Sequence, residues 1–194
     1  WPEQCGRFGL KTEMDEARNL SLNSDGSFHI KTASGNSFDA LSVVVCTGGK
    51  PRRAGFKNED KFFGRGVSTC ATCDGFFYRN KDVVVLGGGN TALEEALYLA
   101  KICNKVYLIH RRDSFSAAPS VVERVKNTKN IEIITNAEVD SVEGDNSGLN
   151  KVIAKNRHSG ELREIEVPGI FVFVGYDLNN EVLKQDNGEF LCAV

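Results

Sequence analysis

A glycine-rich run near the middle of the chain restricts the possible folds more than any other feature. The run Gly87-Gly88-Gly89-Asn90-Thr91-Ala92 fits the pattern G-x-G-x-x-A. It follows the short apolar run 83–86, typical of a buried parallel strand, and it opens a segment whose apolar residues have helical spacing. Strand, glycine turn and helix in this order indicate a dinucleotide-binding βαβ unit.

The positions within this run have separate physical roles in such a unit. Gly87 permits the tight turn, Gly89 lets the backbone approach a pyrophosphate, and Ala92 allows the helix to pack closely on the strand. Asn90 and Thr91 begin the helix, whose free N–H groups and positive dipole end would hold the pyrophosphate. The alternative is a glycine-rich turn without a ligand, which the strand and helix on either side disfavour.

The end of the next predicted strand, 105–110, indicates which nucleotide would bind. His110-Arg111-Arg112 stands where NAD-binding proteins usually carry an acidic residue for the ribose 2′-OH. Two guanidinium groups suit a 2′-phosphate dianion through charge-assisted hydrogen bonds, so we predict NADPH rather than NADH. Two solvated arginines at a strand end are the alternative.

Residues 51 to 176 alternate strand and helix patterns around this loop. A helix is predicted over 90–103 and a second one after Pro119, and strands over 131–134 and 169–174, the last ending at Gly175. Residues 137–167 are predicted as successive strands with turns at 144–146 and 158–160. The predicted fold is α/β, a Rossmann-like three-layer nucleotide-binding domain with an inserted β-meander.

The flanking regions are shorter and less regular. Residues 1–50 are predicted to form a short helix followed by β-structure, with turns at 23–26 and 34–36. The apolar run 41–46 is expected to be a buried strand, with Cys46 at its end and Cys103 on the helix as small buried side chains. The polar stretch 50–53 contains a proline and is predicted to be a domain boundary, and residues 177–194 show no complete element.

Cys70-Ala71-Thr72-Cys73 contains the closely spaced pair among six cysteines. A structural zinc site needs four ligands, and because the other cysteines and the three histidines are scattered, no metal site is expected. A redox pair needs only two thiols close enough to bridge. Asp74 follows the pair, either as a proton donor and acceptor in thiol exchange or as a turn residue before Gly75. A nicotinamide and a disulfide are usually bridged by a flavin, yet the region before residue 50 contains no second G-x-G-x-x-G.

Charge and hydropathy exclude several classes of protein. The chain has 24 basic and 26 acidic side chains and a net charge of -2, which argues against nucleic-acid binding. No segment approaches the roughly 20 apolar residues of a membrane span. The start, Trp1-Pro2, is not a signal peptide, so a cytoplasmic location is expected; it is also unlike a natural beginning, so we expect a piece of a longer protein.

Several motifs in the same order resemble the bacterial low-molecular-weight thioredoxin reductases, which are FAD- and NADPH-dependent pyridine nucleotide-disulfide oxidoreductases. The matching runs are 66–78 (GVSTCATCDGFFY), 87–96 (GGGNTALEEA), 110–113 (HRRD) and 171–175 (FVFVG). The resemblance extends over nearly the whole chain.

The resemblance implies two domains, one that binds FAD and is split in the sequence, and one that binds NADPH and carries the cysteine pair. Residues 51–176 would be the whole NADPH domain, 1–50 the end of the first FAD segment, and 177–194 the start of the second. Three further positions, two of them at the flavin-domain edge, join the cofactor-binding candidates: Thr47, Gly48 and Gly175. Because the N-terminal and C-terminal flavin motifs are absent, we expect the chain on its own to lack turnover.

The resemblance also implies a reaction and a partner. Electrons would pass from NADPH through FAD to the Cys70–Cys73 disulfide and then to thioredoxin, in a protein expected to be a homodimer at full length. Cys73 would be the sulfur nearer the flavin, Cys70 would attack the thioredoxin disulfide, and Asp74 would handle protons. Two alternatives stay open, a reductase serving a peroxidase-linked disulfide and a nucleotide-binding module without turnover. Ser116 stands where the family often has a further arginine, so a weaker NADPH preference is expected.

Overall fold

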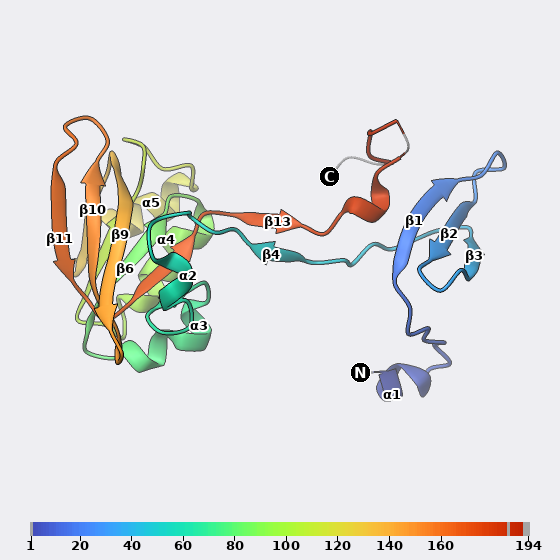
Figure 1. Ribbon diagram of the computed structural model, residues 1–194, viewed down its shortest axis with the longest axis horizontal. Coiled ribbons are helices and arrows are strands. Elements are labelled where there is room, and N and C mark those ends of the chain that lie inside the picture. The colour runs from blue at the N-terminus through green and yellow to red at the C-terminus, as the bar shows by residue number, and fades with distance from the viewer. Residues whose placement is uncertain (1, 186, 192–194) are drawn as a thin grey trace. The chain divides into compact units, whose positions relative to one another are not determined.

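The structure is a computed structural model that describes residues 2–185 and 187–191 (Figure 1). The chain separates into two units, one formed by Trp1–Lys50 with Leu178–Val194 and the other by Pro51–Asp177. The chain crosses between them twice, and the crossings pair as a two-stranded sheet of β4 (Gly49–Pro51) and β13 (Tyr176–Leu178).

The smaller unit consists of a short helix, a three-stranded antiparallel sheet and one 3-10 turn. Its elements are α1 (Pro2–Gly6), β1 (Ala17–Leu22), β2 (Phe28–Thr32), β3 (Ser37–Ala40) and η2 (Glu181–Leu183). The strands lie in the order β1-β2-β3, and the two predicted turn clusters connect them. A helix followed by β-structure is therefore confirmed for this region.

The apolar run 41–46 is not the buried strand that its composition predicts. It forms no strand, and the side chains of Leu41 and Val44 are 91% and 87% exposed. Cys46 is exposed as well, so the prediction that it is buried is wrong, whereas Cys103 is buried as expected. A β-strand forms only when a neighbouring strand satisfies its backbone groups, and none of the described strands pairs with this run. Composition records how apolar a run is but not whether it has a neighbour.

The larger unit is built on a parallel sheet of five strands in the order β5-β12-β6-β7-β8. The strands are β5 (Val67–Ser68), β6 (Asp82–Gly87), β7 (Lys105–Ile109), β8 (Ile131–Ile134) and β12 (Ile170–Phe173). The helices are α2 (Glu59–Phe62), α3 (Ala71–Asp74), η1 (Gly75–Tyr78), α4 (Asn90–Leu99) and α5 (Pro119–Lys126). After β8 the chain forms the antiparallel meander β9 (Ala137–Asp145), β10 (Gly148–Asn156) and β11 (Leu162–Glu166), then returns as β12 on the other side of β6.

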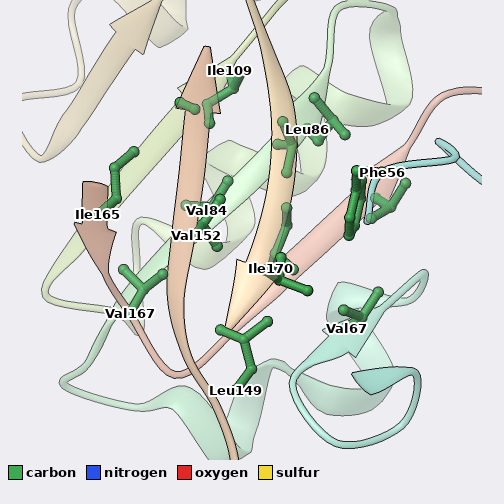
Figure 2. Packing of buried hydrophobic residues seen from close by; sticks show 14 of the residues in the cluster. Phe56, Val67, Val84, Leu86, Ile109, Leu149, Val152, Ile165, Val167 and Ile170 are labelled. Carbon is green, nitrogen blue, oxygen red and sulfur yellow. The ribbon is translucent and has the colours of Figure 1, made fainter. Parts of the chain in front are cut away.

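Strand β6 shows how the sequence produces three layers. Side chains alternate between the faces of a strand, and here both faces are buried. Val83 and Val85 pack among residues of α3, α4 and α5, whereas Val84 and Leu86 pack among residues of the meander. Figure 2 shows the second set, with Val84 close to Val152 of β10. Helices, parallel sheet and meander form the three layers, and the predicted α/β fold is confirmed.

Helix α4 ends at Leu99, four residues before the predicted end. Residues 100–103 continue as a turn in which Lys101 N donates to Tyr98 O at 3.1 Å and Ile102 N to Leu99 O at 3.0 Å. Such i to i+3 bonds tighten the end of a helix. The chain must reverse here to enter β7. The helical spacing of the apolar residues does not indicate this reversal.

Replacing Leu108 with Ala should lower the free energy of unfolding by about 2–5 kcal/mol, because this side chain is fully buried between the sheet and the helices. Leu162→Ala is the matched control, since Leu162 also lies on a strand but is 57% exposed, and it should change stability by about 0.5 kcal/mol or less. Urea unfolding followed by circular dichroism measures both. Equal losses in the two variants would contradict the described core.

Candidate functional site

A cavity of about 800 Å³ opens at the carboxyl ends of three adjacent strands, β6, β7 and β12. Strand order reverses at β6, since the chain continues from it to β7 on one side and reaches β12 on the other side only later. In open parallel sheets such a switch point is where ligands bind. The cavity is lined by eight of the residues proposed from the sequence: Gly87, Gly89, Thr91, Ala92, His110, Arg111, Arg112 and Gly175.

Two glycines of the loop are required by close packing within the protein. A Cβ on Gly87 would overlap the carbonyl oxygen of Phe173 and lie 2.6 Å from the Cβ of Ala92. A Cβ on Gly88 would overlap the imidazole ring of His110. The loop is therefore pressed between β12, the start of α4 and the end of β7.

Gly89 differs from these two glycines because its position faces open space. The nearest atom to a Cβ there would be Ser116 Oγ, at 3.9 Å. Its backbone is extended, with φ of -90° and ψ of 178°, which other residues also adopt. Nothing inside the protein requires a glycine here, so the requirement expected from the motif is the approach of a ligand.

Ser116 fixes the loop from the opposite side. Its backbone N donates to the carbonyl of Gly88 at 2.9 Å, and its Oγ donates to the same oxygen at 3.2 Å. The hydroxyl is thus used within the protein. Ser116 orders the peptide between Gly88 and Gly89 and adds no charge to the cavity that it lines.

His110 is a buried support of the glycine loop. Its ring stacks on Phe115, with centroids 5.2 Å apart, and its Nε2 lies 3.0 Å from the carbonyl oxygen of Ser114. Burial lowers the pKa of this imidazole, and the charges of Arg112 and Arg111 act in the same direction. The ring is therefore neutral near pH 7.

Three of the proposed cofactor residues are not among those that line the cavity of the larger unit. Asn90 Oδ1 accepts a hydrogen bond from Ala118 N at 2.8 Å, so its side chain ties the start of α4 to the start of α5. Thr47 and Gly48 belong to the smaller unit, in a segment exposed from residue 44 to residue 50. Their carbonyl oxygens each accept a hydrogen bond from Asn179, at 3.0 Å.

Cys70 and Cys73 form a disulfide at the start of α3, with Cα atoms 5.3 Å apart. Cys70 is the N-cap of this short helix, and its Sγ accepts a hydrogen bond from Cys73 N at 3.2 Å. Thr72 Oγ1 lies 3.5 Å from the same sulfur. Cys73 is exposed and Cys70 half-buried. In residues 2–185 and 187–191 no group of three or more His, Cys, Asp or Glu side chains could hold a metal ion.

Asp74 is held beside the disulfide by Ser68, which the sequence motifs did not single out. Ser68 Oγ donates to Asp74 Oδ2 at 2.7 Å and accepts from Cys70 N at 3.1 Å. Ser68 is buried at the end of β5, so both contacts are anchored in the sheet. Burial raises the pKa of nearby Tyr78, and the charge of Asp74 raises it further.

Several cavity residues were given no role by sequence reasoning. They are Arg52, Arg53, Thr69, Glu138 and Asp140, among others. The arginine pair was noticed only as part of a domain crossing, and the two acids lie on the meander, far from the motifs in sequence.

The segment that carries the arginine pair is ordered by local contacts. Arg53 lies over the ring of Phe63 at 3.5 Å, and Arg52 pairs with Asp177 at 2.7 Å. Glu59 is buried, and its carboxylate accepts hydrogen bonds from the backbone N–H groups of Ala54 and Gly55. The arginines are therefore presented to the cavity by a fixed loop.

Comparison with known proteins agrees with this geometry. The sequence profile of the family described as pyridine nucleotide-disulphide oxidoreductase matches residues 7–191, and the chain belongs to this family. A thioredoxin reductase of Helicobacter pylori is 54% identical over 192 residues, covering 99% of this chain and 61% of that protein. A thioredoxin reductase of Vibrio cholerae is 37% identical, covering 94% of this chain and 58% of that protein.

Solved structures give the same result. The thioredoxin reductase of Lactococcus lactis superimposes with a TM-score of 0.79 at 31% identity, covering 96% of this chain and 62% of that one. The thioredoxin reductase of Giardia duodenalis superimposes with a TM-score of 0.80 at 34% identity, covering 95% and 60%. The chain thus spans about three fifths of the length of these relatives. None of the helices described is long and apolar enough to cross a membrane.

Exchanging the loop glycines one at a time should separate stability from ligand binding. Gly88→Ala should lower the free energy of unfolding by about 1–3 kcal/mol because of the His110 ring. Gly89→Ala should change stability by about 1 kcal/mol or less but weaken the binding of a nicotinamide dinucleotide at least about tenfold, or about 1.4 kcal/mol. Thermal unfolding and fluorescence titration measure the two effects. If both variants lose stability alike and bind the dinucleotide alike, the assignment of roles is wrong.

The buried imidazole should make stability depend on pH. The pKa of His110 in the folded chain lies below its ordinary value of 6.5. As the pH falls below that value, the unfolded chain therefore binds more protons than the folded chain. The free energy of unfolding should then fall by at most about 1.4 kcal/mol per pH unit. His110→Gln should flatten this dependence between pH 7.5 and 5.5, whereas exposed His158→Gln should leave it unchanged. Equal slopes in both variants would refute the role of His110.

Proposed function

We propose that this chain is the nucleotide-binding and disulfide-bearing part of an NADPH-dependent thioredoxin-disulfide reductase. One observation carries the proposal: a dinucleotide cavity and a Cys-x-x-Cys disulfide are built into the same unit, Pro51–Asp177. Thr69, which lines the cavity, directly precedes Cys70. The thioredoxin reductases reported above support the assignment of the partner.

The cavity fits a nicotinamide dinucleotide. Gly89 leaves open space where a pyrophosphate would meet the start of α4, and Arg111 and Arg112 provide two exposed cations at the end of β7. When bound, NADPH supplies a hydride, that is, a pair of electrons. The protein holds the adenosine end through the two arginines and the pyrophosphate through the loop, so the 2′-phosphate decides the preference over NADH.

The cysteine pair transfers electrons to a partner disulfide by thiol exchange. In the reduced dithiol, the thiolate of Cys70 attacks one sulfur of the partner disulfide, which forms a mixed disulfide and releases one partner thiolate. The thiolate of Cys73 then attacks the sulfur of Cys70 and releases the second partner thiolate. The Cys70–Cys73 disulfide is restored, and the partner has gained two electrons and, on protonation, two protons.

Cys70 is assigned as the attacking sulfur because of its hydrogen bonds. Cys73 N and Thr72 Oγ1 approach its sulfur, and donors to a sulfur favour its thiolate form. Exposure alone would instead favour Cys73 as the attacking sulfur, because Cys73 is more exposed than Cys70. In this proposal Asp74, which accepts a hydrogen bond from Ser68, takes up and returns the protons of the two thiols.

The surface beside the disulfide suits a protein partner. Phe76 and Phe77 follow the pair closely and are 68% and 70% exposed. Exposed aromatic side chains next to a reactive group are typical of interaction sites. Thioredoxin as the partner, a homodimer at full length and a cytoplasmic location stay predictions.

A flavin is the remaining prediction of the family resemblance. Thr47 and Gly48 were proposed to contact it, but their segment is exposed from residue 44 to residue 50. Flavin binding, and the assignment of residues 1–50 and 177–194 to a flavin domain, therefore stay predictions.

Trapping the exchange intermediate tests the proposed function on this chain. After reduction and removal of the reductant, the Cys73→Ser variant should form a stable mixed disulfide with an oxidised bacterial thioredoxin, because no second thiol can resolve it. The Cys70→Ser variant should form far less of it. Non-reducing electrophoresis and mass spectrometry measure the adduct.

Two results would contradict the proposal. No adduct with thioredoxin, but one with a peroxidase-type disulfide protein, would favour the alternative reductase. No adduct with either would favour a nucleotide-binding module without exchange chemistry. NADPH binding should be the same in both serine variants, since neither cysteine lines the cavity.

A further inference from the structure

A third guanidinium group lies beside the Arg111-Arg112 corner, and it comes from the meander. Arg157 directly follows β10, and its Nη1 donates to the carbonyl oxygen of Arg111 at 3.1 Å. Its backbone N donates to Asn136 O at 2.8 Å, and Asn136 N donates in turn to Arg112 O at 3.1 Å. The side chain of Arg157 therefore contacts this corner directly, and its backbone is connected to it through Asn136.

Arg157 also faces an acid of the cavity wall. Glu138 lies on β9 and lines the cavity together with Arg111 and Arg112. Arg157 Nε lies 3.4 Å from Glu138 Oε2. A carboxylate next to the arginine corner would repel a phosphate dianion, and a guanidinium paired with that carboxylate cancels the repulsion.

The loop after β7 supplies no other cation to perform this task. Ser116 lines the cavity but is uncharged, and its hydroxyl is bonded to Gly88 O. Arg52 and Arg53 also line the cavity, but they pair with Asp177 and Asp60. Arg157 is the cation that contacts both the corner and its neighbouring acid.

We propose that Arg157 is a positioning residue that determines the preference for a 2′-phosphate. It neutralises Glu138 and holds the carbonyl of Arg111, so that the corner presents net positive charge to the phosphate. The inference rests on the proposed function, since it concerns the same nucleotide site. It assigns to the inserted meander a part in nucleotide selection that the glycine and arginine motifs do not contain.

Dissociation constants for NADPH and NADH, measured by fluorescence titration of the chain at one fixed low salt concentration, test this inference. Arg157→Ala should weaken NADPH binding about fivefold, as expected for an exposed charge pair, and change NADH binding by about twofold or less. Adding Glu138→Gln to Arg157→Ala should restore most of the lost NADPH affinity, because the unpaired acid is removed. Arg163→Ala is the matched control: Arg163 pairs with Glu132 at 2.7 Å outside the cavity, and its loss should leave both constants unchanged.

The ratio of the two constants distinguishes selection from a merely structural role. Equal weakening of both nucleotides by Arg157→Ala, or no weakening of either, would overturn the inference. Failure of Glu138→Gln to rescue would overturn the neutralisation on which it depends. If the unmodified chain itself does not prefer NADPH, the proposed nucleotide function fails and this inference with it. If the unmodified chain prefers NADPH and Arg157→Ala keeps the full preference, only this inference fails.

Discussion

The close approach of β6, β12 and α4 at Gly87 is the constraint on which the site depends. Strand β6 is buried on both faces, so it cannot move away from its neighbours. A Cβ added at Gly87, at the end of this strand, would overlap Phe173 O and crowd Ala92. Only because this first glycine lets the three elements converge do the ends of β6, β7 and β12 surround one cavity. The core and the candidate nucleotide site are thus set by the same packing.

Local features of this arrangement could be predicted from the sequence. The apolar run 83–86, the glycine loop and the helical spacing after it are read within about twenty residues, and each follows from sterics and periodicity. The meander was also predictable, because its turns carry Gly, Asp and Asn. The last residue of α4 and the absence of a strand at 41–46 could not be predicted. The first depends on where the chain reverses to enter β7, and the second on whether a neighbouring strand is available for pairing.

The candidate site shows the same division at the level of single side chains. Gly87 and Gly89 follow the motif, but Asn90 turns to Ala118, and no spacing rule indicates that its side chain is used there. Glu138 reaches the site from a strand that the motifs do not include, and Ser68 lies inside the run 66–78 but was given no role there. Long-range partners of this kind leave no periodic pattern in a single sequence, so only the folded chain brings them into view.

The separation of the two sites within one unit explains why a further component is required. Thr69 borders the cavity, but Cys70 and Cys73 are not among the residues that line it. Under the proposed function, a nucleotide bound in this cavity would not lie against the disulfide sulfurs. A carrier that meets both sites, or a movement that brings them together, has to complete the transfer, which is the physical reason for expecting a flavin beside this unit. Under the proposed function, the order of electron transfer would be decided by what contacts the nucleotide and the disulfide in turn.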